Sequence, residues 1–596
     1  MKKIRIGGAS GYWGDSAYAT AQLLDKGEVD YLVYDYLAEV TMSLLANARS
    51  RSDQLGYATD FVQQILKPNL QSIARRGVKV VANAGGVNLE ACQRAIQQLL
   101  AEQGLSLTVG IVSGDNLLSR EDEFRAAGVT ELSTGEPFPE KLASINAYLG
   151  AFPIASALNG GADIVITGRV VDSATALGVL IHEYGWTFED YGQLAMGSLA
   201  GHLIECGCQV TGGNFTDWQE SCDGWADMGY PIVECQENGQ FVITKAQETG
   251  GLVSPLTVSE QLIYEIGDPQ AYFLPDVVCD FSAVTLETES PNRVVVKGAK
   301  GYPPTKSYKV SATFRDGYRA TYTQLITGFD VIEKAQMTGE AILKRCNTLF
   351  KTLGYSGFKQ SSIDVLGANA LWNSDGVKAP EQLQEVVLRL AVHHSEREAV
   401  ALFSREVMGV LLNMTPGRCA AGAAGRPKVS PVIRLYSFLL EKGQVPCSAS
   451  VGDLQIPYAA AHSLHFDPEA RVRPAALSNC QIQGSTQKVS LIKLAVARSG
   501  DKGNHANIGV IARKPEYLPY ICSALTESAV AQRFSHVLKG RVERFYLPGI
   551  HALNFLLHDA LGGGGVASMR ADTQGKTYAQ QLLAMPIEVP LNLLEG

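Results

Sequence analysis

Three observations predict an α/β protein built from three parts. In roughly the first two hundred residues, short apolar runs alternate with helical stretches, which is typical of a parallel sheet covered by helices on both faces. From residue 211 onward, strands joined by turns predominate, which favours a mixed α+β region. Residues 488–596 again combine strands and helices over the length of one domain. We therefore expect domains at 1–210, 211–442 and 488–596, with a linker at 443–487, where Ala, Ser and Pro are frequent and periodicity is weak.

Five apolar segments of the N-terminal region favour buried strands. They are Ile4–Ile6, Tyr31–Tyr34, Val78–Ala82, Leu107–Val112 and Ile164–Thr167. Together with the helical segments between them, they predict a Rossmann-like parallel sheet. Ligands of such sheets bind in the crevice outside the carboxyl ends of the strands, so we expect the polar residues that follow these segments to lie around one site.

The first predicted strand runs into the spaced glycines of Gly-Ala-Ser-Gly-Tyr-Trp-Gly, residues 8–14, and a helical segment follows. Glycines at such a turn let the backbone approach a phosphate, which the amides at a helix N-terminus can bind. Trp13 and Asp15, however, put a bulky ring and a negative charge where a pyrophosphate would lie. The loop is therefore either the binding site for a nucleotide-containing ligand such as CoA or one wall of an active site that binds no phosphate. Its candidate ligand-binding residues are Gly8, Ser10, Gly11 and Gly14.

The segments after the later strands are rich in acids, amides and glycines. Carboxylates that share one crevice raise the pKa of at least one of them, which favours a general base or acid, or they bind a divalent cation such as Mg²⁺. An arginine beside them supplies a positive charge for a carboxylate, an enolate oxygen or a thioester carbonyl. The alternative is an ion pair with ordinary helix caps. The candidate catalytic residues are Asp35, Glu39, Asp115, Arg169, Asp172 and Ser173, and the candidate ligand-binding residues are Asn83, Gly85, Gly86 and Asn88.

A second cluster lies in the segment Gly-His-Leu-Ile-Glu-Cys-Gly-Cys, residues 201–208. On a helix, His202, Glu205 and Cys206 would share one face, which suits a Cys–His nucleophilic pair. Cys206 and Cys208 beside the histidine could hold zinc, although the second half of a structural zinc pattern is missing. A hydrogen-bonded core histidine beside a buried cysteine is the plainer alternative. We take His202 and Glu205 as candidate catalytic residues.

The middle region contains predicted strands and two long predicted helices. The strands include Ile232–Cys235, Phe241–Thr244, Tyr308–Phe314 and Tyr318–Ile326, and the helices are Glu333–Leu353 and Arg397–Leu412. The first two strands form a predicted hairpin. The last two flank Arg-Asp-Gly at 315–317, where we expect a turn.

The C-terminal part resembles a ferredoxin-like α+β fold. Its predicted elements are the strands Val489–Ala497 and Ile508–Arg513, two helices, the strand Val542–Leu547 and the helix Ala552–Leu561. Between the first two strands, residues 497–507 form a predicted loop dense in glycine and polar groups, typical of functional loops. We expect this loop either to enter the main crevice or to contact another subunit. Its candidate ligand-binding residues are Arg498, Ser499, Asp501, Lys502 and Asn504.

Composition argues against several classes of protein. The 596 residues carry a net charge of −9 and no basic block or stripe, so nucleic acid is not an expected partner. No segment approaches the roughly 18 apolar residues of a membrane span, and glycines follow Met-Lys-Lys where a secretory signal needs an apolar core. The 11 cysteines, an odd number, favour reduced thiols. We therefore expect a cytoplasmic protein without membrane contact.

Several motifs together resemble the acyclic terpene utilisation family, AtuA. They are Gly-Gly-Ala-Ser-Gly-Tyr-Trp-Gly-Asp (7–15), Asp-Tyr-Leu-Ala-Glu (35–39), Asn-Ala-Gly-Gly-Val-Asn (83–88), Thr-Gly-Arg-Val-Val-Asp-Ser (167–173) and Gly-Gly-Asn-Phe (212–215). The segment Ala-Arg-Ser-Gly-Asp-Lys-Gly-Asn (497–504) is similar to the ferredoxin-fold domain often fused to that family. The resemblance extends over nearly the whole chain.

The resemblance implies a role in citronellol and geraniol breakdown, in which 3-hydroxy-3-isohexenylglutaryl-CoA is cleaved. It thus implies an acyl-CoA substrate, and we also expect a homo-oligomer. In such a retro-Claisen step a base takes the proton of the tertiary hydroxyl and a positive group stabilises the departing enolate. Asp35, Asp115 or Asp172 is then the expected base, and Arg169, with or without a divalent cation, is the expected enolate partner. The alternatives are hydration or isomerisation of an acyl-CoA by the same acids, or a non-catalytic scaffold subunit.

Overall fold

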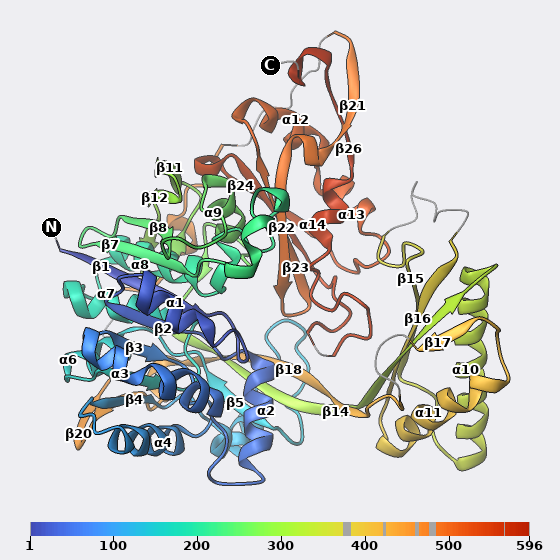
Figure 1. Cartoon of the computed structure of the whole chain (residues 1–596), viewed down its shortest axis with the longest axis horizontal. Helices are drawn as coiled ribbons and strands as arrows, with labels where there is room; N and C mark the ends of the chain where they lie inside the picture. Colours follow the sequence, from blue (N-terminus) through green and yellow to red (C-terminus); the bar gives the residue numbers. More distant parts are fainter. Residues whose placement is uncertain are drawn as a thin grey trace.

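The computed structural model of the chain describes residues 2–372, 383–420, 425–458, 464–475, 484–565 and 567–594, and the side chains of Glu39, Val410 and Ala420 lie outside this description. The molecule is a mixed α/β protein with three visible parts (Figure 1). A large body contains the N-terminal sheet. A smaller lobe with helices α10 (Val331–Leu353) and α11 (Arg397–Gly409) projects from it, and the C-terminal domain packs against the body.

One large mixed sheet organises the body. Its strands are β1 (Lys3–Ser10), β2 (Tyr31–Tyr34), β3 (Lys79–Ala82), β4 (Val109–Ser113), β6 (Ile164–Thr167), β7 (Pro231–Gln236), β8 (Phe241–Lys245), β11 (Thr285–Ser290), β12 (Arg293–Lys297), β19 (Ser448–Val451) and β20 (Leu454–Pro457). Across the described residues they lie in the order β11-β12-β8-β7-β1-β2-β3-β6-β4-β19-β20. The neighbours among β1, β2, β3, β6 and β4 are parallel, and these are the five strands expected from the sequence.

Antiparallel strands extend this parallel centre at both edges. β7 pairs antiparallel with β1, and β19 pairs antiparallel with β4. The sheet is therefore mixed, and the expected Rossmann-like parallel sheet is not confirmed. The predicted hairpin is confirmed, because β7 and β8 are antiparallel neighbours.

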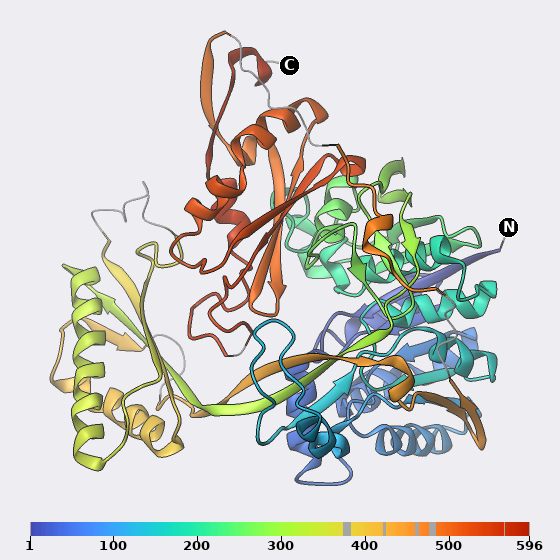
Figure 2. The same ribbon diagram turned by 180° about the vertical axis from the view of Figure 1, so that it is seen from behind.

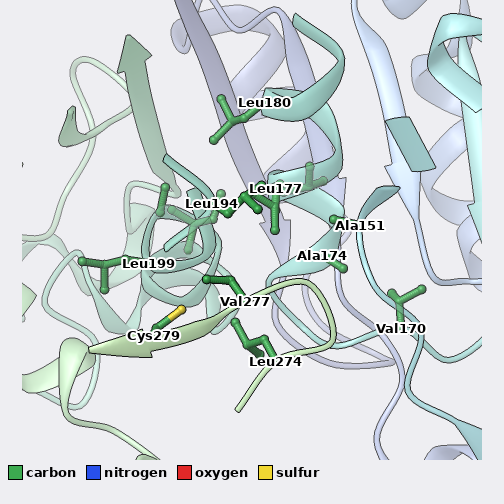
Figure 3. Close-up of a cluster of buried hydrophobic side chains, with 14 of the residues drawn as sticks. Ala151, Val170, Ala174, Leu177, Leu180, Leu194, Leu199, Leu274, Val277 and Cys279 are labelled. Atoms are coloured by element: carbon green, nitrogen blue, oxygen red, sulfur yellow. The ribbon is translucent and has the colours of Figure 1, made fainter. Parts of the chain in front are cut away.

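Helices cover both faces of the parallel centre. The helices of the body are α1 (Tyr18–Lys26), α2 (Glu39–Arg49), α3 (Lys67–Arg76), α4 (Leu89–Glu102), α5 (Glu121–Ala126), α6 (Phe152–Asn159), α7 (Ala174–Tyr184), α8 (Tyr191–Ile204) and α9 (Pro255–Leu262). Among them, α1, α4, α6 and α7 pack directly on the parallel strands. Alternate residues of β2 and β3 enter different cores: Leu32 and Val80 pack in the core of α1, α3 and α4, whereas Val33 and Val81 pack in the core of α6, α7 and α8. Figure 3 shows part of the second core, where leucines of α7 and α8 lie near Val277.

The body and the lobe share one long strand, β14 (Ser307–Thr327). Its first half pairs with β18 (Ser430–Glu441) and β5 (Ser144–Ala147), and its second half pairs with β16 (Glu385–His394) and β17 (Arg418–Ala420). The strand β15 (Gln360–Leu366) pairs with β16 at the edge of the lobe. Figure 2 shows the yellow-green strand β14 and the orange strand β18 crossing together from body to lobe.

The expected turn at residues 315–317 is wrong, because β14 continues through it. The pairing with β18 shifts its register here, and Gly317 has φ of +83°. These features describe a bulge, in which Asp316 and Gly317 interrupt the ladder without ending the strand. The Asp316 carboxylate accepts hydrogen bonds from Lys359 Nζ (2.7 Å) and from Arg434 Nε. A bulge and a turn use the same residue types, and the pairing of β14 with β18 on both sides of Asp316 and Gly317 distinguishes them.

The main sheet includes strands from three of the four expected segments. β7, β8, β11 and β12 come from 211–442, and β19 and β20 come from the expected linker at 443–487. The domain boundaries themselves stay predictions. A small separate sheet in the middle region contains β9 (Tyr272–Phe273), β10 (Val278–Asp280) and β13 (Lys300–Tyr302).

The C-terminal domain contains an antiparallel sheet in the order β22-β23-β25-β24. Its strands are β22 (Ala495–Lys502), β23 (His505–Ala512), β24 (Val542–Leu547) and β25 (Ala552–Leu557), and its helices are α12 (Leu518–Ala524), α13 (Glu527–Arg533) and α14 (Tyr578–Leu583). Two further strands, β21 (Thr486–Ser490) and β26 (Pro586–Pro590), pair with each other.

Two expectations for this domain are wrong. Ala552–Leu557 is the strand β25 and not a helix, because Leu553, Phe555 and Leu557 alternate into the core of the domain while Asn554 faces the body. The predicted loop at 497–507 is the hairpin of β22 and β23, turning only at Gly503 and Asn504. Arg498 and Asn507 find hydrogen-bond partners on the body, whereas Ser499, Asp501 and Asn504 find them within the C-terminal domain.

Candidate functional site

Charged side chains converge outside the carboxyl ends of the parallel strands, as expected. Asp35 follows β2, Arg169 and Asp172 follow β6, and Glu205 caps the C-terminus of α8. The charges of all three of these neighbours act on the pKa of Asp35. The structure therefore brings four of the predicted catalytic residues into one crevice.

Asp35 has the environment of a general base. Burial raises its pKa well above the usual carboxyl range; the charges of Asp172 and Glu205 raise it further, and Arg169 opposes them. The carboxylate accepts a hydrogen bond from Asn83 Nδ2. The residue as a whole is partly exposed.

Arg169 is the buried cation of the crevice. Its side chain is 5% exposed, and Nη1 donates to Asp172 Oδ1 (2.7 Å) and to the carbonyl of Val170 (2.9 Å). The guanidinium carbon lies 4.2 Å from the centre of the Tyr148 ring. The Asp172 side chain is 40% exposed, so the ion pair opens toward solvent on the carboxylate side.

Asp115 lies behind this ion pair. It is 1% exposed, and its Oδ2 accepts hydrogen bonds from Asn146 Nδ2 (2.8 Å) and from the backbone N–H of Arg169 (2.9 Å). Burial raises the pKa of Asp115 to about 6, although these hydrogen bonds act to lower it. Asp115 therefore positions the segment that carries Arg169, and its role as the base stays a prediction.

A small open pocket borders Arg169. Its lining residues are Met42, Ser144, Asn146, Tyr148, Arg169, Ser311 and Thr313. The hydroxyls of Ser144 and Thr313 bond to each other at 2.6 Å. Asn146 Oδ1 and Ser311 Oγ are buried and have no hydrogen-bond partner among the described residues. The pocket wall thus offers an acceptor and a hydroxyl to a polar group.

His202 and Glu205 share a proton at the end of α8. His202 Nε2 lies 3.2 Å from the carbonyl of Leu262, which can only accept, so this nitrogen carries hydrogen. His202 Nδ1 lies 2.9 Å from Glu205 Oε1, and one proton serves both atoms. Burial raises the pKa of Glu205 to about 7, although the positive charge of His202 acts to lower it. Burial lowers the pKa of His202, but the charge and hydrogen bond of Glu205 outweigh it and leave that pKa raised.

The zinc site considered from the sequence does not fit this arrangement, whereas a divalent cation such as Mg²⁺ stays a prediction. In the part of the chain that the structure describes, no group of three or more His, Cys, Asp or Glu side chains is placed to hold a metal ion. The crevice carboxylates are engaged by Asn83, Arg169 and His202. Burial also raises the pKa values of the Cys206 and Cys208 thiols, which disfavours the thiolates that zinc requires.

The C-terminal domain supplies residues that sequence reasoning missed. Lys576 Nζ donates to Glu265 Oε1 (2.7 Å) and Asp501 Oδ1 (3.0 Å) and also bonds to the Tyr264 hydroxyl. Glu265 has φ of +56°, rare for a residue with a side chain, and Asn507 Oδ1 accepts from its backbone N–H (2.9 Å). The charge of Glu265 raises the pKa of Glu205. Partners this remote in sequence leave no local signal.

Three other residues of the predicted C-terminal loop make structural contacts: Arg498 joins the domain to the body, whereas Ser499 and Asn504 bond within the domain. Arg498 donates to Glu260 Oε2 (2.8 and 3.1 Å) and to Gln209 Oε1 (2.7 Å) in a buried network. Ser499 Oγ donates to the carbonyl of Gly575 (2.6 Å). Asn504 Oδ1 accepts from Gly563 N–H (2.7 Å). Ligand binding by Arg498, Ser499 and Asn504 stays a prediction, whereas the structure shows their contacts within the protein.

The opening loop uses its glycines to approach another part of the protein. A Cβ on Gly8 would meet the carbonyl oxygen of Ile204 at 2.6 Å, and one on Gly11 would meet the backbone of Cys206 at 2.9 Å. Asp15 accepts from the N–H groups of Gly11 (2.9 Å) and Ser16 (2.7 Å), so its own carboxylate occupies amides that a phosphate would need. Binding of CoA by this loop stays a prediction.

The remaining predicted residues lie near the crevice with largely structural contacts. Asn88 caps α4, accepting from Ala91 N–H. Ser10 Oγ donates to a backbone carbonyl, Ser173 is buried beside Gly201 of α8, and Glu39 begins α2 with its side chain outside the described residues. Gly85 and Gly86 lie against backbone carbonyls at the end of β3, and Gly14 has φ of +100°.

Fold and site together define a class: a mixed α/β protein with a charged crevice at the carboxyl edge of its sheet, onto which a C-terminal α+β domain docks. The family model described as acyclic terpene utilisation family protein AtuA matches residues 4–451, and the model of the AtuA ferredoxin-like domain matches residues 489–588. The chain belongs to the acyclic terpene utilisation family. No curated protein and no solved structure matches it. None of the helices in the described ranges is long and apolar enough to cross a membrane.

Proposed function

We propose that the protein is a carbon–carbon lyase that cleaves 3-hydroxy-3-isohexenylglutaryl-CoA or a related branched 3-hydroxyacyl-CoA. One observation carries the proposal: the buried cation Arg169 lies in a crevice with Asp35, whose pKa is raised, and with Asp172 and Glu205. The terpene part of the proposal rests on membership of the family, and the CoA thioester is what the resemblance of the motifs implies.

The crevice supplies what a retro-Claisen step needs. The carboxylate of Asp35 takes the proton of the tertiary hydroxyl. The bond between the hydroxyl-bearing carbon and the neighbouring methylene breaks, the hydroxyl oxygen becomes a ketone oxygen, and the bonding electrons pass to the departing enolate. Arg169 is the positive group that stabilises this enolate, at low cost in reorganisation because Tyr148 and Asp172 already hold it.

The His202–Glu205 pair completes the proton balance. The departing enolate must gain one proton on carbon to leave as acetyl-CoA or acetate. With its pKa raised to about 7, Glu205 holds a proton at neutral pH in a substantial fraction of molecules. Asp35 then returns its proton to solvent and Glu205 regains one, so that the cycle is neutral overall.

Product analysis tests the reaction. The protein is incubated with a branched 3-hydroxyglutaryl-CoA, and products are followed by mass spectrometry. We expect a 3-oxo product together with acetyl-CoA or acetate, and we expect Asp35→Asn to abolish their formation while Asp122→Asn, a change at an exposed surface acid, leaves it intact. A product that has only lost water would overturn the lyase in favour of a hydratase.

A further inference from the structure

The tip of the β22–β23 hairpin is held rigidly. Its turn residue Asn504 accepts from Gly563 N–H through Oδ1 (2.7 Å) and from the N–H groups of Ala560 and Leu561 through its carbonyl (3.0 and 3.2 Å). Gly564 packs so closely that an added Cβ would lie 2.2 Å from the carbonyl oxygen of Gly503. The hairpin end therefore presents its last strand residue, Lys502, from a fixed position.

Lys502 reaches the His202 side of the crevice. Its Nζ lies 5.3 Å from the centre of the Tyr272 ring, and that ring lies 5.8 Å from the His202 ring. The positive charge of Lys502 accordingly opposes protonation of His202. A residue of the C-terminal domain thus contributes charge to the site on the body.

Lys502 differs from Arg169 and Lys576 in having no acidic partner among the described residues. Arg169 is paired with Asp172, and Lys576 is paired with Glu265 and Asp501. Across the described residues, no carboxylate lies within 4.0 Å of Lys502 Nζ, and the side chain is exposed. Its positive charge is therefore available to a ligand.

The surrounding acids limit where an anionic ligand can bind. Asp35, Asp172, Glu205 and Glu265 repel a carboxylate when they are ionised, unlike the ammonium of Lys502 at the rim of the crevice. We propose that Lys502 binds a free carboxylate of the substrate, so that the C-terminal domain selects CoA thioesters of dicarboxylic acids. This inference rests on the proposed function for its substrate class. The phosphates of CoA are the other anions that the same ammonium would attract.

Binding measurements on two thioesters separate these anions. The probes are 3-methylglutaryl-CoA, which has the free carboxylate but no hydroxyl and cannot be cleaved, and 3-methylbutanoyl-CoA, which lacks the carboxylate. Isothermal titration is made on the full chain, on Lys502→Gln, on Lys502→Arg and on the control Lys493→Gln, an exposed lysine of the same domain.

We expect the unaltered protein to prefer 3-methylglutaryl-CoA by about tenfold or more, as one charge-assisted hydrogen bond provides. Lys502→Gln should remove this preference, and Lys502→Arg and Lys493→Gln should keep it. Equal weakening of both thioesters by Lys502→Gln would overturn the proposal in favour of contact with the CoA phosphates, and an unchanged preference would overturn it outright.

The two proposals fail in different ways. Because neither probe can be cleaved, a preference that depends on Lys502 supports the inference even if no lyase product is ever found. Cleavage without a preference for the carboxylate would overturn only the inference. Absence of binding by both thioesters to the unaltered protein would overturn this inference together with the CoA part of the proposed function.

Discussion

Two buried arginines, Arg169 and Arg498, make ion pairs of different kinds. Arg498 is 4% exposed and its partner Glu260 is fully buried, so this pair is closed on both sides. Arg169 is 5% exposed, but its partner Asp172 is 40% exposed. The closed pair joins the C-terminal domain to the body, whereas the half-open pair faces a crevice. In these two pairs the exposure of the carboxylate partner, and not that of the arginine, separates the structural contact from the candidate site.

Removing the partner of the closed pair should give the largest effect. Glu260→Ala leaves the Arg498 guanidinium buried without its carboxylate, and we expect a loss of about 3–5 kcal/mol in the free energy of unfolding. Chemical denaturation of the variant measures it. Glu289→Ala, which breaks a surface pair with Arg293, should cost about 0–1 kcal/mol. If Glu260→Ala does not fold, the milder Glu260→Gln should still lose more stability than Glu289→Ala; equal losses would contradict a structural role for the closed pair.

Removing the arginine of the half-open pair should affect turnover more than folding. Arg169→Ala takes away the positive partner of the enolate, and we expect kcat to fall about 10²–10³-fold. Arg76→Ala, at an exposed pair, is the control and should leave kcat unchanged. Steady-state kinetics and thermal unfolding are measured on the same samples. A variant that unfolds readily but keeps its turnover would place Arg169 with the structural arginines.

The pH profile tests the acid beside Arg169. Asp35 acts in its ionised form, and burial with neighbouring acids raises its pKa, so activity should be lost as pH falls through that raised pKa. We expect kcat/KM to rise with pH, about tenfold per unit on the acidic limb, with the midpoint well above the range of an ordinary aspartate. A profile that is flat down to the ordinary aspartate range would exclude Asp35 as the base.

The smallest expected effect is on stability, from substitution of a glycine in the opening loop. Gly8→Ala would push a Cβ against the carbonyl of Ile204, and we expect a loss of about 1–3 kcal/mol in stability, without any ligand present. Gly192→Ala is the matched control, because nothing lies within 4 Å of its added Cβ and it is a helical residue of α8. That change should be neutral or stabilising by roughly 0.5–1 kcal/mol. Equal stability of both variants would remove the packing explanation of Gly8.

Regular elements with strong periodicity could be predicted from the sequence. The five parallel strands and the β7–β8 hairpin were predictable because apolar residues that alternate or run continuously must be buried on the faces of a sheet. The predictions failed where one local sequence pattern fits two kinds of element. Ala552–Leu557 contains apolar residues compatible with either a helix or a strand, and only pairing with β23 and β24 made it a strand.

The candidate site was predictable to the extent that it follows the strand ends. Asp35, Arg169 and Asp172 were found because parallel strands bring their carboxyl ends to one edge. Asp115 was included by the same rule, and its carboxylate bonds to Asn146 and to the backbone of Arg169. Glu265 was missed because it comes into the site from a segment held by the C-terminal domain.

The sequence by itself determined the strands that make the parallel centre, the family and the set of polar residues at the strand ends, because these depend on local periodicity and composition. Only the tertiary structure decided which charges are engaged and which remain open to a ligand. Arg498 and Lys502 lie four residues apart in one strand, yet the first finds a buried carboxylate and the second finds none. That difference arises from residues distant in sequence, since burial and pairing depend on what the folded chain places beside each side chain.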